Sequence, residues 1–256
     1  MRVVVNPKYA DLTDFIKTVL DSNYSHGTVY RNARNRVEET VANGRRVVVK
    51  IFGKPSLFNR LVYSVLRPTK ARRSYEYSLE LLKMGFEVPE PVGYVESYKG
   101  GLLDLSCFVC VYSDYKPVAD FINYDERSDD ELVKCHGFAS EFSKFAAELH
   151  GKGVIHGDFN RENILYKIVD GKWHFSMIDL NRASFGNKNE KKFAQEMGHL
   201  GFDIALLSTV VKLYSALRGL EPRQTLAYAV GQSVRYSRRK RIKRAILCAI
   251  GLKKKM

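Results

Sequence analysis

The chain has 256 residues, of which 45% are hydrophobic and 27% are charged, enough for one large domain or two small lobes around a real core. It contains no stretch that approaches the roughly 18–20 consecutive apolar residues of a membrane span. The N-terminus, "MRVVVNPKYADL", has only a short apolar run before polar residues. We therefore expect a protein that stays in the cytoplasm.

The formal net charge of +14 is concentrated at one end of the chain. Residues 235–256 hold ten Lys or Arg and no acid, so the rest of the chain carries only +4. Attraction to a polyanion should therefore come from this tail.

The four cysteines are too few for a disulfide framework, which fits a reducing compartment. Cys107 and Cys110 have C-x-x-C spacing, but they lie in "DLSCFVCVY", which indicates a β-strand. Side chains three residues apart in a strand point to opposite faces, so we expect no metal or redox site there.

The first part of the chain is rich in predicted strands. The run "RRVVVKIF" (45–52) is apolar and β-rich, and "LSCFVCVY" (105–112) is a strand by its branched and aromatic content. Between them, Tyr75, Leu79 and Leu82 recur at helical spacing within residues 72–94, and Gly85 and Pro89 close that helix.

The second part of the chain is mainly helical. Residues 131–150 form a predicted amphipathic helix, with Phe138, Phe142, Phe145 and Leu149 on one face. Two short strands, "NILYKIV" and "HFSMIDL", are turned by Asp170-Gly171, and beyond residue 200 a helical stripe contains Ile204, Leu207, Val211 and Tyr214. We predict an α+β fold with a strand-rich N-lobe (1–113), a connection near 112–116 and a C-lobe (114–256).

The stretch "VIHGDFNRENILY" (154–166) concentrates polar chemistry on one loop after the predicted helix. It carries Asp158 and Asn163, and the following strand pair ends in Asp179. One carboxylate could accept a proton while the other and the amide hold a divalent cation, and hard oxygen ligands without a Cys or His cluster favour Mg²⁺. Phosphate transfer from a nucleotide is the leading hypothesis.

The segments "HGDFNRENIL" and "IDLNR" resemble the catalytic loop and metal-binding strand of the protein-kinase-like superfamily, in the H-G-D-x-x-x-x-N form typical of small-molecule and sugar kinases. With "KARRSYEYSLELLKMGFEVPEPVGY" upstream, the frame resembles the lipopolysaccharide core kinases that phosphorylate heptose or Kdo. The resemblance covers about residues 28–215. It implies a two-lobed, protein-kinase-like fold and a phosphotransferase that uses ATP and Mg²⁺.

The resemblance also implies roles for individual residues. Asp158 would be the catalytic base, and Asn163 and Asp179 would hold Mg²⁺ against the ATP phosphates. His156 would be a scaffold for the loop, and Asp203 would brace the loop from below.

On the nucleotide side, Lys50 matches the strand lysine that grips the phosphates, and Tyr112 at the connection is a further candidate contact for the cofactor. Glu76 is the helix carboxylate expected to pair with Lys50. Glu80 lies one turn later on the same face, so spacing alone leaves it as an alternative.

The sequence departs from the protein-kinase pattern in three places. No G-x-G-x-x-G precedes Lys50, and residues 29–39 supply arginines instead, so phosphates would be covered by backbone amides and by Arg31, Arg34 or Arg36. Asn160 stands where many protein kinases have Lys, and the guanidinium of Arg161 could contact the γ-phosphate. No A-P-E follows Asp179, which leaves little room for a segment that docks a protein substrate.

We predict a kinase that phosphorylates a heptose or Kdo hydroxyl of the lipopolysaccharide inner core, with a lipid-linked core as acceptor. One alternative is a soluble phosphotransferase of the aminoglycoside or choline type, although the basic character of the chain argues against a cationic substrate. A second is an atypical, RIO-like protein kinase or ATPase associated with RNA through the tail. Loss of activity with the fold retained is a further alternative.

Two segments are candidates for contact with an anionic inner-membrane surface. In the tail, Ile242, Ala245, Ile246, Ala249 and Ile250 fall on one helical stripe beside seven Lys or Arg between residues 235 and 244. In residues 56–73, apolar side chains at helical spacing end in basic residues. The alternatives for the tail are packing on the C-lobe and binding of RNA. If these segments contact the membrane, the enzyme is peripheral on the inner face of the cytoplasmic membrane.

Overall fold

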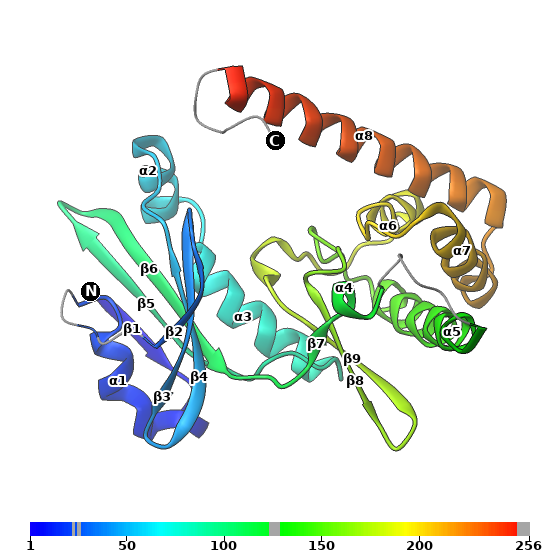
Figure 1. Cartoon of the computed structure of the whole chain (residues 1–256). Helices are drawn as coiled ribbons and strands as arrows, with labels where there is room; N and C mark the ends of the chain where they lie inside the picture. The colour runs from blue at the N-terminus through cyan, green and yellow to red at the C-terminus, as the bar shows by residue number, and fades with distance from the viewer. Residues whose placement is uncertain (22–23, 25–26, 123–128, 250–256) are drawn as a thin grey trace. The chain divides into compact units, whose positions relative to one another are not determined.

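The computed structural model describes residues 1–21, 24, 27–122 and 129–249. The chain divides into two compact units, one of residues 1–115 with 176–182 and one of residues 116–175 with 183–256. The first unit holds a large sheet and the second is mainly helical, so the predicted α+β class is confirmed (Figure 1). Residues 176–182, which the sequence analysis placed in the C-lobe, cluster with the first unit.

The first unit is built on a six-stranded sheet in which every neighbouring pair is antiparallel. The strand order is β1-β5-β6-β4-β3-β2. The strands are β1 (Arg2–Val5), β2 (Thr28–Asn32), β3 (Asn35–Ala42), β4 (Arg45–Phe52), β5 (Pro91–Lys99) and β6 (Leu102–Val111). Its helical segments are η1 (Pro7–Leu12), α1 (Thr13–Thr18), α2 (Leu57–Val65), α3 (Lys70–Lys83) and η2 (Leu180–Arg182).

The two faces of this sheet bury different clusters, because side chains alternate along each strand. Cys107 belongs to a cluster with Leu12 and Ile16 of η1 and α1. Cys110 belongs to a cluster with Tyr75 of α3. The two thiols therefore lie on opposite faces, as predicted, and both are free and buried.

The second unit contains a small sheet in the order β7-β8-β9 and five helices within its described residues. Its elements are β7 (Lys116–Pro117), α4 (Val118–Phe121), α5 (Asp129–Gly151), β8 (Ile164–Val169), β9 (Lys172–Met177), α6 (Glu190–Met197), α7 (Ile204–Arg218) and α8 (Pro222–Ala249). Asp170 and Gly171 both have positive φ, at 50° and 74°. This is the conformation that the predicted two-residue hairpin requires.

An aromatic core anchors the loop that follows α5. Phe138 and Phe142 of α5 are fully buried, as the predicted stripe requires. The Phe142 ring lies 5.9 Å from that of Phe159 and 5.5 Å from that of Phe175, between centroids. Phe159, next to Asp158 in the loop, is itself fully buried and so fixes the loop to the core.

The predicted stripe on α7 is only partly right. Leu207, Val211 and Tyr214 are buried, but Ile204 is 62% exposed. Ile204 is the first residue of the helix, directly after the N-cap Asp203. At that position the helix has not yet reached the core, so the helical period overestimates the buried stripe by one residue.

Helix α8 packs against α6 through a close backbone approach. A Cβ added at Gly198, the C-cap of α6, would lie 2.1 Å from the carbonyl oxygen of Ala229. Ala229 and Thr225 are buried in this contact. Gly198 therefore allows the first half of α8 to pack on α6.

We expect Gly198→Ala to lower the free energy of unfolding by about 1–3 kcal/mol, because overpacking displaces α8 from α6. Gly231→Ala, on α8, is the matched control, since an added Cβ there meets no atom within 4 Å. It should be neutral or stabilising, because alanine favours a helix interior over glycine. Urea unfolding of both variants measures the difference, and equal stabilities would show that the α6–α8 contact tolerates a methyl group.

Candidate active site

The loop between α5 and β8 places Asp158 on a tight turn. Gly157 has φ 78°, in the left-handed region that glycine adopts without strain. The backbone N–H of Asp158 donates to Nδ1 of His156, at 3.2 Å, and His156 is buried. The predicted scaffold role of His156 thus has a concrete contact, because its ring accepts a hydrogen bond from the backbone of Asp158.

Asn160 orients the carboxylate of Asp158. Its Nδ2 donates to Oδ1 and to the carbonyl oxygen of Asp158, both at 3.1 Å. Its Oδ1 accepts from the backbone N–H groups of Glu162 and Asn163. The residue that replaces lysine therefore forms the turn itself, a role that the sequence analysis did not assign.

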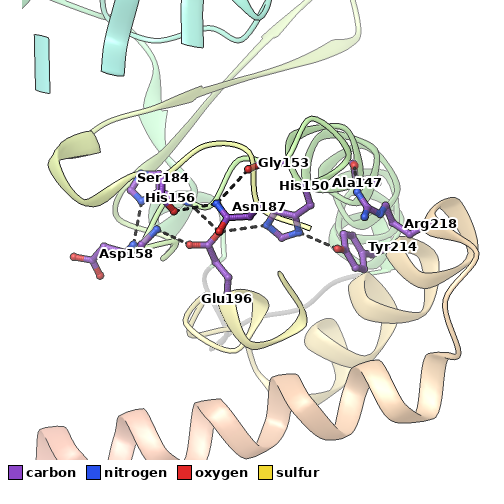
Figure 2. Close-up of polar contacts among 11 residues, drawn as sticks. Ala147, His150, Gly153, His156, Asp158, Ser184, Asn187, Glu196, Tyr214 and Arg218 are labelled. Carbon is purple, nitrogen blue, oxygen red and sulfur yellow. Dashed lines mark hydrogen bonds and ion pairs between the residues drawn. The ribbon is translucent and has the colours of Figure 1, made fainter. Parts of the chain in front are cut away.

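A buried carboxylate supports this loop from α6. Glu196 is 3% exposed, and its two oxygens accept from successive backbone amides (Figure 2). Gly157 N–H donates to Oε1 at 2.6 Å, and His156 N–H donates to Oε2 at 3.0 Å. Glu196 therefore fixes the peptide planes that immediately precede Asp158.

His150 of α5 and Tyr214 of α7 complete the network (Figure 2). His150 Nε2 lies 3.3 Å from Oε2 of Glu196, and Nδ1 lies 2.9 Å from the Tyr214 hydroxyl. The His150 ring thus bridges the Glu196 carboxylate and the Tyr214 hydroxyl. One chain of hydrogen bonds thus joins α5, α6, α7 and the loop.

The surroundings of Glu196 keep it ionised. Burial by itself would raise the pKa of its carboxyl group. The hydrogen bond with His150, the electrostatic interactions with His150 and His156, and the hydrogen bond from the Gly157 amide outweigh burial and lower that pKa below its usual value. An ionised carboxylate is an acceptor at both oxygens, which is what two amide donors require.

The bracing role expected of Asp203 stays a prediction, and its carboxylate has a defined contact at the start of α7. Its carboxylate caps α7, accepting from the Leu206 N–H at 2.8 Å. The loop amides of His156 and Gly157 donate to Glu196, which the sequence analysis did not identify. The sequence signal that could have identified Glu196 is an acid among the apolar residues of "EKKFAQEM", on the face that α6 buries.

In the first unit, Lys50 at strand β4 is paired with Asp179. Lys50 Nζ lies 2.6 Å from Oδ1 of Asp179, and Asn181 Nδ2 donates to the same oxygen at 2.5 Å. Asp179 has φ 60°, a left-handed conformation that a non-glycine residue adopts at some cost. The structure thus brings together a predicted phosphate-binding lysine and a predicted metal ligand.

The predicted ion pair between Lys50 and a helix carboxylate is not formed among the described residues. Glu76 pairs with Arg72, whose Nε lies 2.7 Å from Oε1, and Glu80 lies 4.0 Å from Lys83. Arg72 is one turn from Glu76 on α3, the spacing at which opposite charges meet on a helix. This local partner competes with Lys50, which the sequence spacing could not reveal.

A group of cations surrounds this part of the first unit. Arg34 and Lys70 line one cavity beside Phe52 and Gly53. Burial lowers the pKa of Lys70, and the positive charges of Arg34, Arg182 and Arg73 lower it further, against the charge of Asp179. Concentrated positive charge of this kind suits an anion such as phosphate. Lys70, the first residue of α3, was not identified from the sequence.

The other predicted phosphate-side residues have different surroundings. Arg36 is ion-paired with Glu38 at 2.6 Å, and Arg31 lies exposed on β2. The ring of Tyr112 is covered on one face by the Arg46 guanidinium, 3.6 Å from its centroid. Of the three arginines proposed to cover phosphates, only Arg34 lines the cavity with Lys70.

Arg161 follows Asn160 in the catalytic loop. Its backbone N–H donates to the Leu200 carbonyl and its own carbonyl accepts from Ala119 N–H. The side chain lies along Gly201, where an added Cβ would be 3.9 Å from its Nε. The backbone of Arg161 is therefore fixed by hydrogen bonds at both its N–H and its carbonyl group. Its side chain lies against Gly201, which has no side chain.

Each unit holds one residue with the chemistry of a magnesium ligand. Asn163 Nδ2 donates to the Asp158 carbonyl at 2.9 Å, so the amide oxygen is the atom that can face a cation. Asp179 contributes a partly exposed carboxylate. No group of three or more His, Cys, Asp or Glu is placed to hold a metal in the part of the chain that the structure describes. Mg²⁺ is typically held by a small number of protein ligands together with substrate phosphates.

Comparison with known proteins identifies the family. The model of the lipopolysaccharide kinase (Kdo/WaaP) family matches residues 22–210, well over half of the chain. The chain belongs to this family. It is therefore a kinase of the lipopolysaccharide kinase family, as the sequence resemblance implied.

Among solved structures, the chain is similar to that of WaaP in complex with acyl carrier protein. The TM-score is 0.61 at 18% identity, over 93% of this chain and 98% of that chain. A double mutant of the Mycobacterium tuberculosis PknI kinase domain matches with a TM-score of 0.41 at 13% identity, over 79% and 77%. A search of curated proteins found no match. The predicted kinase-like fold is confirmed.

No described helix of this kinase is long and apolar enough to span a bilayer.

Glu196→Gln tests the support of the catalytic loop. We expect kcat to fall by about 10- to 100-fold while the KM for nucleotide changes little, because small misplacement of a catalytic group is costly. A glutamine offers one acceptor oxygen, and its amide group faces a backbone N–H. Steady-state kinetics, normalised to folded protein, measures the effect.

Glu190→Gln is the matched control for this substitution. Glu190 lies on the same helix but pairs with Arg218, 2.5 Å away, and makes no described contact with the loop. It should keep the kcat of the wild type. If Glu196→Gln lowered only thermal stability and kept kcat, Glu196 would support the fold and not the position of Asp158.

Proposed function

We propose that this kinase transfers the γ-phosphate of ATP to a hydroxyl of heptose or Kdo in the lipopolysaccharide inner core, with Mg²⁺ as the metal. The observation that carries the proposal is the fixed carboxylate of Asp158. Asn160 holds its Oδ1, His156 accepts from its backbone N–H, and its neighbour Phe159 is anchored in the core. A carboxylate so placed can accept the proton of an alcohol acceptor.

The proposal assigns binding roles to residues of both units. Lys50 and Arg34 bind nucleotide phosphates, with Lys70 as a further cation near Arg34. Asn163 and Asp179 hold Mg²⁺, which neutralises charge that develops on the transferred phosphoryl group. Arg161 contacts the γ-phosphate, and Glu76 and Tyr112 remain predicted contacts on the nucleotide side.

The acceptor is proposed to be a sugar and not a protein. Only 23 residues lie between Asp179 and Asp203, and η2 and α6 take up residues 180–182 and 190–197 of them. Little chain remains there for docking a peptide. The family of lipopolysaccharide kinases supports a core sugar as the acceptor.

Asp158→Asn should lower kcat by about 10²- to 10⁴-fold, the usual contribution of a positioned general base, with little change in nucleotide affinity. The assay is transfer of labelled phosphate from ATP to dephosphorylated core oligosaccharide, with nucleotide binding measured by fluorescence titration. Asp170→Asn is the control, because the hairpin turn tolerates Asn in a left-handed conformation. Wild-type turnover by Asp158→Asn would reject the assigned base.

The substrate itself is tested in cells. Mass spectrometry of the lipopolysaccharide core, with and without the gene, should show one phosphate fewer when the gene is absent. The fragment that carries the difference identifies the sugar. An unchanged core would reject the proposed acceptor, and the soluble small-molecule alternative would then be tested with amino-alcohol substrates.

The proposed location is the inner face of the cytoplasmic membrane, with the basic tail on anionic lipid. Helix α8 carries exposed arginines in its second half, and Ile242 and Ile246 are 49% and 55% exposed. Ile242, Ala245 and Ile246, the members of the stripe whose side chains are described, are therefore not buried against the C-lobe. Residues 250–256 of the predicted tail lie outside the described part of the chain.

Replacing four exposed arginines between residues 235 and 241 of α8 with alanine should release the kinase from anionic vesicles at low salt. Each near-surface Arg contributes about 1 kcal/mol toward anionic lipid. The four residues are Arg235, Arg238, Arg239 and Arg241. Vesicle sedimentation at rising salt measures the loss.

The control for this variant removes the same charge from four other lysines: Lys17, Lys83 and Lys144 on other helices, and Lys152 just after α5. It should bind vesicles nearly as well as the wild type. Equal loss in both variants would assign the attraction to net charge. Salt-dependent binding of RNA in preference to anionic vesicles would favour the RNA-associated alternative.

A further inference from the structure

Helix α2 exposes its apolar side to solvent. Four of its large side chains are more than half exposed, and so is the residue that follows it. They are Leu57 (75%), Phe58 (75%), Leu61 (53%), Val65 (74%) and Leu66 (78%). None of the nine residues of α2 is buried. The helix therefore contributes little to the core of the first unit, although it is strongly amphipathic.

The polar side of α2 is the side bound to the protein. Arg60 Nε donates to the Leu103 carbonyl at 2.7 Å, and its guanidinium lies 3.6 Å from Asp104. Ser64 Oγ accepts from the Leu103 N–H at 2.9 Å. Arg60 and Ser64 are one turn apart, so one face of the helix is fastened to the start of β6 by polar contacts.

This orientation is the reverse of that of an ordinary surface helix, which buries its apolar stripe and exposes its polar face. Single exposed apolar residues are common on soluble proteins, but a contiguous apolar face marks a contact surface. The polar anchors hold α2 in this orientation without help from burial. The apolar face is thus available to a partner.

We propose that α2 lies flat in the surface of an anionic lipid bilayer and inserts its apolar side chains. Residues 54–73 contain no Asp or Glu. Arg67, just after the helix, is exposed, and so is Lys54 before it, which also pairs with Asp104. Basic groups at the ends of an apolar face match phosphate headgroups over acyl chains. At nine residues the helix is far too short to cross a bilayer.

This inference deepens the proposed function, because a kinase that acts on a lipid-linked acceptor must work at a bilayer. It rests on α2 alone and is independent of the tail. Contact through α2 is mainly apolar, whereas contact through α8 is electrostatic. High salt, which screens exposed charges, therefore separates the two contributions.

The test is the double substitution Leu57→Ser and Phe58→Ser in the full chain. Binding to vesicles of phosphatidylglycerol and phosphatidylethanolamine is measured by sedimentation at high salt. The partition coefficient should fall at least about tenfold, because two large apolar side chains no longer insert. Val41→Ser is the control, since Val41 is 63% exposed in the same unit but lies on β3. It should bind as the wild type does.

The folding of the variants is checked by thermal unfolding, which should not change because the replaced side chains are exposed. Vesicle binding equal to that of the wild type would overturn the inference. A wild type that is dimeric in solution, with the double variant monomeric, would also overturn it and assign the face to contact between copies.

A kinase assay separates this inference from the proposed function. With delipidated core oligosaccharide the double variant should keep wild-type activity, and with acceptor embedded in vesicles its activity should fall. Equal loss on both acceptors would overturn the membrane role of α2. If the wild type phosphorylates neither acceptor but the vesicle result holds, the proposed function fails and the membrane contact stands.

Discussion

The catalytic loop depends on one buried carboxylate. Glu196 receives the amides of His156 and Gly157 on its two oxygens, and His150 lies against one of them. A buried charge is costly unless hydrogen bonds satisfy it, and here the loop backbone supplies them. The loop can therefore not leave this position without stranding the carboxylate. The same hydrogen bonds therefore stabilise the second unit and position Asp158.

The loop is fixed by alternating polar and apolar anchors. Glu196 holds the residues before Asp158, the buried ring of Phe159 holds the next position, and Ile164 enters β8 fully buried. Asn160 closes the turn between them with hydrogen bonds to Asp158 and to later amides. Asp158 remains partly exposed within this constrained segment. The general-base role proposed for Asp158 requires rigid support of this kind, because the geometry of a base must be set before the acceptor arrives.

The sequence predicted what local periodicity and spacing control. Strand β4 has the predicted bounds, and the loop carrying Asp158 lies between the predicted helix and strand. Pairing between side chains of distant segments was harder to predict, because several possible partners satisfy the same sequence spacing. Lys50 met Asp179 and not Glu76, since Arg72 on the same helix was a closer partner for Glu76. Glu196 was missed because its hydrogen-bond donors lie about 40 residues earlier in the chain, so no local pattern links them.

Amphipathicity alone does not say which way a helix faces. The apolar stripe of α5 is buried, whereas that of α2 is exposed, although both follow helical spacing. The difference lies in the polar face: Arg60 and Ser64 of α2 find backbone partners on β6. Those hydrogen bonds replace apolar burial as the means of attachment. A protein that keeps its fold in water while offering apolar side chains to another phase needs an attachment of this kind, since burial would consume the surface to be offered.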